Sequence, residues 1–134
     1  MYQRQAIHLS IACPFAVAYD YLADPLNYPS WAAVDEATFQ HRDGQEWSAE
    51  TEFGPRRIWF CERNAYGVLD HAVYKAGDEP VVMPMRIVPN GNGCELTFLF
   101  YRRPGVSAEQ FSSAIEWVTT DFLVLKALLE ARPS

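Results

Sequence analysis

His71 is the side chain in this sequence best suited to acid–base chemistry. Alternation in its segment places Leu69, His71 and Val73 on one face of a strand. If that face is the inner one, His71 is the only imidazole placed to act as a general acid or base near neutral pH. The alternative is a histidine that hydrogen-bonds locally or faces solvent.

Asp121 is the second candidate, and it lies one helical turn from Trp117. Its carboxylate would polarise a ligand hydroxyl or pair with an arginine such as Arg86; a solvated aspartate is the alternative. Arg86 lies on the strand face opposite Met83 and Met85, where it would clamp a ligand carboxylate or pair with a glutamate on the convex surface. We expect the surface pair. His71 and Asp121 are therefore the catalytic candidates, and they do not make a complete acid–base pair.

The cysteines are expected to be free thiols. Cys13, Cys61 and Cys94 are odd in number and widely spaced, with no CxxC motif, which argues against a disulfide framework or a zinc site. A catalytic cysteine needs a positive neighbour to lower its pKa, and the sequence shows none beside them. No nucleophile motif or metal-ligand cluster is present, so neither a metal nor an organic cofactor is expected.

Charge and hydropathy exclude two classes of partner. The formal net charge is −6, and the basic pairs Arg56-Arg57 and Arg102-Arg103 are too short for a nucleic-acid-binding stripe. No window reaches the roughly 18 consecutive apolar residues of a membrane span, and the polar N-terminus has no secretory signal. We expect one cytoplasmic domain over residues 1–134 that does not bind nucleic acid.

Alternating and helical periods divide most of the chain into short elements. Residues 7–11 predict a strand, and Pro14, Asp24-Pro25 and Pro29 bound two short helices that end at Trp31. Pro84 weakens the strand that contains it, because proline has no N–H for the ladder. Short connections predict an antiparallel sheet. Six further strands are expected over residues 36–42, 47–53, 57–63, 68–74, 81–88 and 94–102, with Trp47, Ala49, Thr51 and Phe53 on the core face of the second.

The last third of the chain predicts a long amphipathic helix. Ser107 and Gln110 form a capping-box pattern after Pro104-Gly105. An apolar stripe of about five turns follows, and it requires an equally long surface such as a curved sheet. The stripe consists of Phe111, Ile115, Val118, Phe122, Leu125 and Leu129, widened on one flank by Ala114, Trp117, Val124 and Leu128.

This order of elements resembles the helix-grip superfamily, which includes START-like lipid carriers, birch-pollen-allergen-like proteins and polyketide cyclases/dehydratases. Three segments carry the resemblance: residues 11–25 (IACPFAVAYDYLADP), residues 28–31 (YPSW) and residues 125–130 (LKALLE). The chain is most similar to small bacterial members described as polyketide cyclase-like. The resemblance implies an α+β helix-grip fold, with a curved antiparallel sheet of about seven strands around the C-terminal helix.

The resemblance also implies an apolar cavity between the sheet and the long helix. The alternative is that the same side chains pack against residues 111–129 and leave no void. Methionine favours the cavity, because its flexible thioether adapts to varied ligands. The ligand-binding candidates are Trp31, His71, Met83, Met85, Phe98, Phe100, Trp117 and Asp121.

Three functions remain open, because a fold alone does not choose among them. The first is binding of a small hydrophobic molecule, such as an aromatic or polyketide-like compound or a lipid, by a monomer or homodimer. The second is a cyclase/dehydratase-type enzyme that uses a cavity acid or base. The third is an interaction domain similar to the activators of the ninety-kilodalton heat-shock chaperone.

Overall fold

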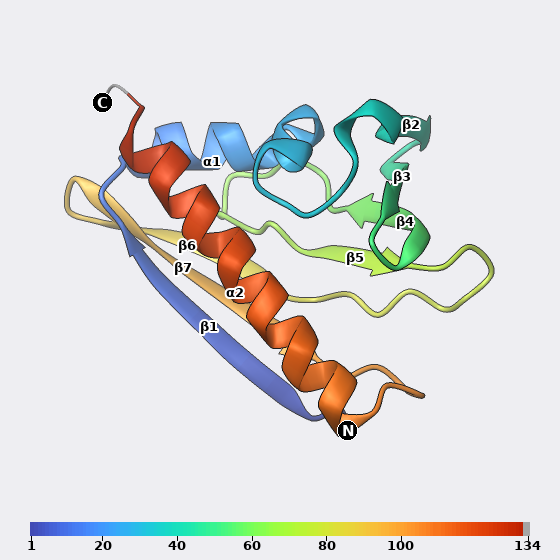
Figure 1. Cartoon of the computed structure of the whole chain (residues 1–134). Coiled ribbons are helices and arrows are strands. Elements are labelled where there is room, and N and C mark those ends of the chain that lie inside the picture. Colours follow the sequence, from blue (N-terminus) through green and yellow to red (C-terminus); the bar gives the residue numbers. More distant parts are fainter. Residues whose placement is uncertain (133–134) are drawn as a thin grey trace.

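The computed structural model describes residues 1–132, as a long C-terminal helix against two antiparallel sheets (Figure 1). Within these residues no helix is long and apolar enough to cross a membrane. The helices are α1 (Phe15–Ala23), the 3₁₀ helices η1 (Pro25–Ser30) and η2 (Glu36–Thr38), and α2 (Ala108–Glu130). The strands are β1 (Arg4–Ile11), β2 (Gln40–Asp43), β3 (Glu46–Thr51), β4 (Gly54–Phe60), β5 (His71–Tyr74), β6 (Met85–Asn90) and β7 (Gly93–Tyr101).

The predicted seven strands form two sheets that meet at a seam. One sheet has the order β1-β7-β6 and the other the order β2-β3-β4-β5. Two isolated bridges, Val68 with Arg86 and His71 with Met83, connect them. The expectation of one continuous sheet is thus corrected to two sheets joined by sparse pairing.

Gly67 brings the two sheets together at this seam. Its carbonyl accepts a hydrogen bond of 2.9 Å from the Ile87 amide, and its φ is +72°. A Cβ there would overlap the Ile87 carbonyl oxygen. Glycine is therefore required for both the conformation and the close approach.

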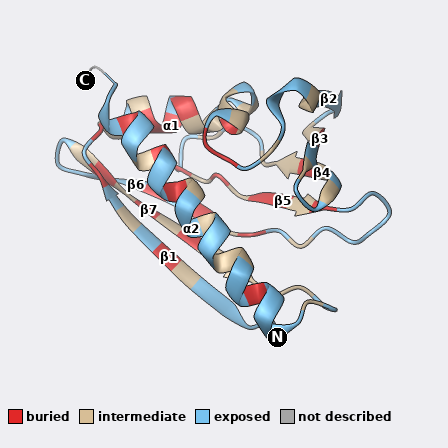
Figure 2. Cartoon of the chain, in the orientation of Figure 1, coloured by how far each residue is buried: buried red, intermediate tan, exposed pale blue. Residues whose placement is uncertain are grey.

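The long amphipathic helix predicted after Ser107 is confirmed, and it is α2. The Ser107 side chain accepts from the Gln110 amide, and the Gln110 side chain accepts from the Ser107 amide, which completes the capping box. Phe111, Phe122, Leu125 and Leu129 are buried. They mark the stripe that faces the sheets, and the opposite side of α2 is exposed (Figure 2).

Local hydrogen bonds and prolines explain where the predicted strands were wrong. Residues 36–38 form η2 because the Asp35 carboxylate accepts from the Ala37 amide. Asn64 holds the amides of Tyr66 and Val68 in a turn, so the strand expected at residue 68 begins at His71. The strand expected over 81–88 begins after Pro84 and runs to Asn90 instead.

The β3–β4 hairpin has the predicted core face at Trp47 and Ala49, but not at Phe53. Phe53 lies in the turn and is 66% exposed, whereas Ser48, predicted to face water, is 8% exposed. The strand expected to extend to residue 63 ends at Phe60. Trp47 and Ala49 do share a face with Ile58 and Phe60, as the β3–β4 register shows.

Candidate ligand site

His71 lies inside the protein at the seam between the sheets. It is the first residue of β5, pairs with Phe60 on β4, and is 8% exposed. Its ring stacks on Phe98 of β7 at 5.5 Å between centroids and meets the Tyr28 ring edge-on at 6.0 Å. His71 therefore packs among aromatic rings in the interior of the protein.

The surroundings of His71 fix the state of its imidazole. Burial lowers the pKa of His71, more strongly than the Leu69 carbonyl and the charge of Asp70 raise it, so the ring is neutral at pH 7. Nδ1 lies 3.2 Å from the Leu69 carbonyl oxygen. Because a carbonyl only accepts, Nδ1 carries the proton, and Nε2 is left with its lone pair.

Tyr28 is the main site residue that sequence analysis missed. The Asp24 carboxylate caps η1 by accepting from the Leu26 amide, and this helix places the Tyr28 ring against Phe60 at 5.1 Å and Trp31 at 5.2 Å. Burial, and then the charge of Asp121, raise the pKa of the Tyr28 phenol, so it stays protonated. The YPSW segment suggested a family resemblance, but gave no sign that its tyrosine meets the histidine.

Two polar atoms in this aromatic cluster have no protein partner. Among residues 1–132, the Tyr28 hydroxyl and His71 Nε2 form no hydrogen bond. In the same residues, no fully buried side-chain nitrogen or oxygen lacks a partner. Each of these two atoms therefore keeps surface that a water-sized molecule can reach.

Asp121 closes one side of the cluster. It projects from α2, and its Oδ2 accepts from the Ala33 amide at 3.4 Å. Burial raises the pKa of Asp121 to about 6, while the Ala33 amide opposes this rise. The suggested pairing with Arg86 is wrong: Arg86 pairs with Asp70, which also accepts from the Met85 amide at 2.8 Å.

Most of the other predicted site residues pack in the core around His71, and one lies at the surface. The Trp31 ring lies 5.4 Å from Phe122, which in turn contacts Phe98 at 5.1 Å. Phe100 continues this layer toward the start of α2.

The two methionines have different surroundings. Met85 pairs in register with Phe98, whereas the Met83 sulfur accepts a hydrogen bond from the Tyr101 amide at 3.2 Å. Trp117 lies at the surface, where it is 42% exposed and its ring meets that of Phe53 at 6.3 Å between centroids.

Comparison with known proteins identifies the architecture. No protein-family model and no curated protein matches the sequence. Among solved structures, the crystal structure of Ara h 8.0201 is similar with a TM-score of 0.70, at 10% identity over 98% of this chain and 100% of that one. The Aha1 dimer from Colwellia psychrerythraea gives 0.72, at 13% identity over 96% and 97%, and CalU16 from Micromonospora echinospora gives 0.67, at 12% over 99% and 78%.

This chain has the helix-grip fold. Sequence identities this low show a shared architecture, and a shared architecture does not indicate a shared function. In this helix-grip chain the aromatic cluster lies where α2 faces the seam, and it combines an acceptor, a hydroxyl and a carboxylate.

The three cysteine thiols of this helix-grip chain lie where burial raises their pKa values. All three cysteines are free, and burial raises the pKa of each thiol, to about 11 for Cys94. Such thiols are poor nucleophiles. Within the described part of the chain, no three His, Cys, Asp or Glu side chains gather in a way that would hold a metal ion.

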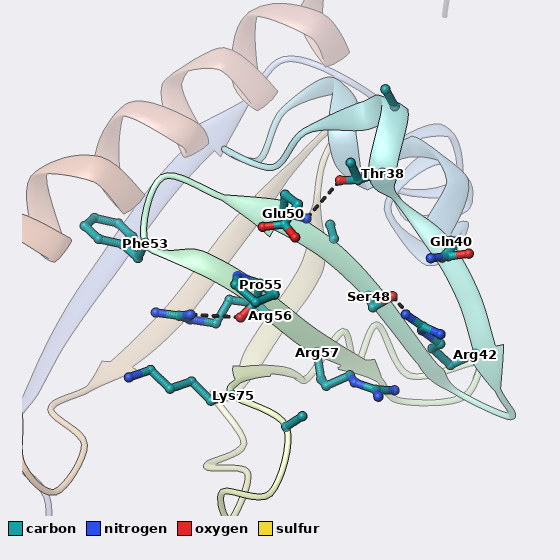
Figure 3. A pocket seen from close by; sticks show the side chains of 13 residues that line it. Thr38, Gln40, Arg42, Ser48, Glu50, Phe53, Pro55, Arg56, Arg57 and Lys75 are labelled. Carbon is teal, nitrogen blue, oxygen red and sulfur yellow. Dashed lines mark hydrogen bonds between the residues drawn. The ribbon is translucent and has the colours of Figure 1, made fainter.

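A large hollow lies along the second sheet, lined by residues from both of its faces. It has a volume of about 740 Å³ and is open to solvent, with α2 behind the sheet (Figure 3). Sequence analysis missed this surface, because its residues come from separate strands and turns. It is lined by Ala37, Thr38, Gln40, Arg42, Ser48, Ala49, Glu50, Phe53, Pro55, Arg56, Arg57, Lys75 and Ala76.

Proposed function

We propose that this protein binds a small hydrophobic molecule bearing a hydroxyl group, between α2 and the seam of the two sheets. The observation that carries the proposal is the pair of unpartnered polar atoms, Tyr28 Oη and His71 Nε2, inside an aromatic lining. Ligand sites commonly combine apolar walls with a few convergent polar groups.

The chemistry of the two atoms specifies the ligand's polar group. His71 Nε2 has a lone pair and accepts from a donor, while the Tyr28 hydroxyl both donates and accepts. A ligand hydroxyl meets both needs, because it donates to the imidazole and accepts from the phenol. Phe60, Phe98 and Trp31 offer flat apolar faces, which suit an aromatic or polyketide-like skeleton.

A cyclase/dehydratase-type reaction is the second candidate, and the protonation states favour it. Neutral His71 can take a proton through Nε2, and Asp121, with a pKa of about 6, can supply one in mildly acidic solution. The third possibility, an interaction domain, rests on the shared fold alone.

A matched pair of ligands tests the binding proposal. Isothermal titration calorimetry would compare 2-naphthol with 2-methylnaphthalene, which has a similar shape and no hydroxyl. We expect a preference of about tenfold for 2-naphthol, since one or two net hydrogen bonds contribute about 1 kcal/mol each. Tyr28→Phe and His71→Phe keep an aromatic ring and should each reduce that preference.

Two results would contradict the proposal. One is the absence of binding by either compound, supported by native mass spectrometry that finds no retained small molecule in the purified protein. The other is an equal preference for 2-naphthol in the wild type and in the Tyr28→Phe, His71→Phe double variant. Loss of turnover with retained binding in His71→Phe would instead favour the enzyme.

A further inference from the structure

The large hollow along the second sheet is lined mainly by basic side chains, although the chain as a whole is acidic. Register places Ser48 beside Gln40 on one side and Arg57 on the other, so these three side chains share the outer face. The inner face of the same strands carries Trp47, Ile58 and Phe60, which belong to the core side. The hollow therefore begins on the outer face at Ser48 and Arg57 and extends past the β3–β4 turn, where Phe53 lines it, to Arg56, which is in register with Ala49 on the other face.

The charge of the hollow is opposite to that of the chain. Four of the eleven lysine and arginine residues line it, with one of the seventeen acidic residues, Glu50, so its net charge is +3 on a chain of −6. Arg57 pairs with Glu46 at 3.0 Å. Arg42, Arg56 and Lys75 have no carboxylate partner among residues 1–132.

One end of the hollow presents two guanidinium groups around a hydroxyl. Arg42 Nε donates to Ser48 Oγ at 2.8 Å, and Arg57 lies directly across from Ser48 on β4. Each of these arginines keeps N–H groups that its protein partner does not use. The planar N–H fork of arginine matches the two oxygens of a carboxylate.

The other end holds a second pair of cations beside an exposed ring. Lys75 follows β5, and Arg56 turns back to donate to the Pro55 carbonyl at 2.9 Å (Figure 3). Arg103 lies near Arg56, because the pKa of Arg103 is lowered first by burial and then by the charge of Arg56. Phe53 borders this end and is 66% exposed. Glu50 and Pro55 lie between the two basic ends.

We propose that this hollow binds an acidic segment of a partner protein, one that carries carboxylates at two separated positions. The hollow is broad and open, whereas small-molecule sites enclose most of their ligand. A single small anion reaches one basic end and leaves the other empty. An extended segment with acidic residues several positions apart contacts both, and Phe53 gives its apolar side chains a surface.

Fluorescence anisotropy with a defined peptide tests this inference. The probe is a fluorescein-labelled peptide of alternating Glu and Gly, and its control replaces every Glu with Gln. We expect binding of the Glu peptide that weakens about fivefold between roughly 50 and 300 mM salt, because exposed charges are screened. Arg42→Gln and Lys75→Gln should each weaken it about threefold to tenfold, and the double variant more than either. Arg4→Gln, a loss of equal charge at the exposed start of β1, should have no effect.

Binding of 2-naphthol and the thermal unfolding midpoint establish that each variant is folded. Three outcomes would overturn the inference: equal binding of the Gln peptide, unchanged binding by the Arg42→Gln, Lys75→Gln double variant, or tighter binding of inorganic pyrophosphate that depends on one end only. A fourth such outcome comes from light scattering of the protein without peptide. Self-association that these substitutions abolish would make a second copy of the chain the occupant.

Discussion

The buried carboxylate of Asp121 leads to a specific prediction about pH and stability. Asp121 lies on α2 under the 31–35 loop, accepts from the Ala33 amide, and faces Tyr28 as its titratable neighbour. Its pKa rises from 3.8 to about 6, which corresponds to about 3 kcal/mol at 1.36 kcal/mol per pKa unit. The side chain is only partly buried, so solvent reduces the expected effect to about 1–2 kcal/mol.

The direction of the effect follows from the raised pKa. The folded protein holds this proton more tightly than the unfolded chain, so the stabilisation is fully present below pH 3.8 and is lost as pH rises through about 6. Asp121→Asn removes the charge and keeps an oxygen that can accept from Ala33. We expect the variant to be more stable than wild type by about 1–2 kcal/mol at pH 8, and nearly equal to it at pH 4.

Urea unfolding at pH 4, 6 and 8, followed by tryptophan fluorescence, measures this difference. Glu116→Gln is the control, since it removes an exposed carboxylate from the same helix. Two results would refute the reasoning: an Asp121→Asn variant less stable than wild type at pH 8, or a gain that does not change between pH 4 and pH 8.

Substitutions at three further positions test how the fold supports the site. Phe122→Ala should lower the free energy of unfolding by about 3–5 kcal/mol in urea titrations, since its buried ring contacts Trp31 and Phe98; a loss below 1 kcal/mol would contradict this packing. Ser107→Ala should cost about 1 kcal/mol by the same assay, while Ser107→Asp should restore the N-cap of α2. Gly67→Ala should lose at least about 2 kcal/mol and speed hydrogen exchange across the seam; wild-type stability would refute the close approach to Ile87.

Local patterns determined the architecture of this protein. The capping box and the stripe from Phe111 to Leu129 predicted α2, because these signals depend on residues near one another in sequence. The predicted strand boundaries were wrong where one side chain, such as that of Asp35 or Asn64, holds the backbone in a turn through local hydrogen bonds.

Only the tertiary structure decided what these elements place together. Tyr28 and His71 are far apart in sequence, and their meeting depends on how η1 packs over the seam. The basic hollow brings together Arg42 of β2, Arg57 of β4 and Lys75 after β5, which no single segment of the sequence encodes. The raised pKa of Asp121 arises from burial against a loop some ninety residues earlier in the chain. Periodicity assigns each side chain to a face, but its neighbours, its solvent access and its charge state depend on long-range packing.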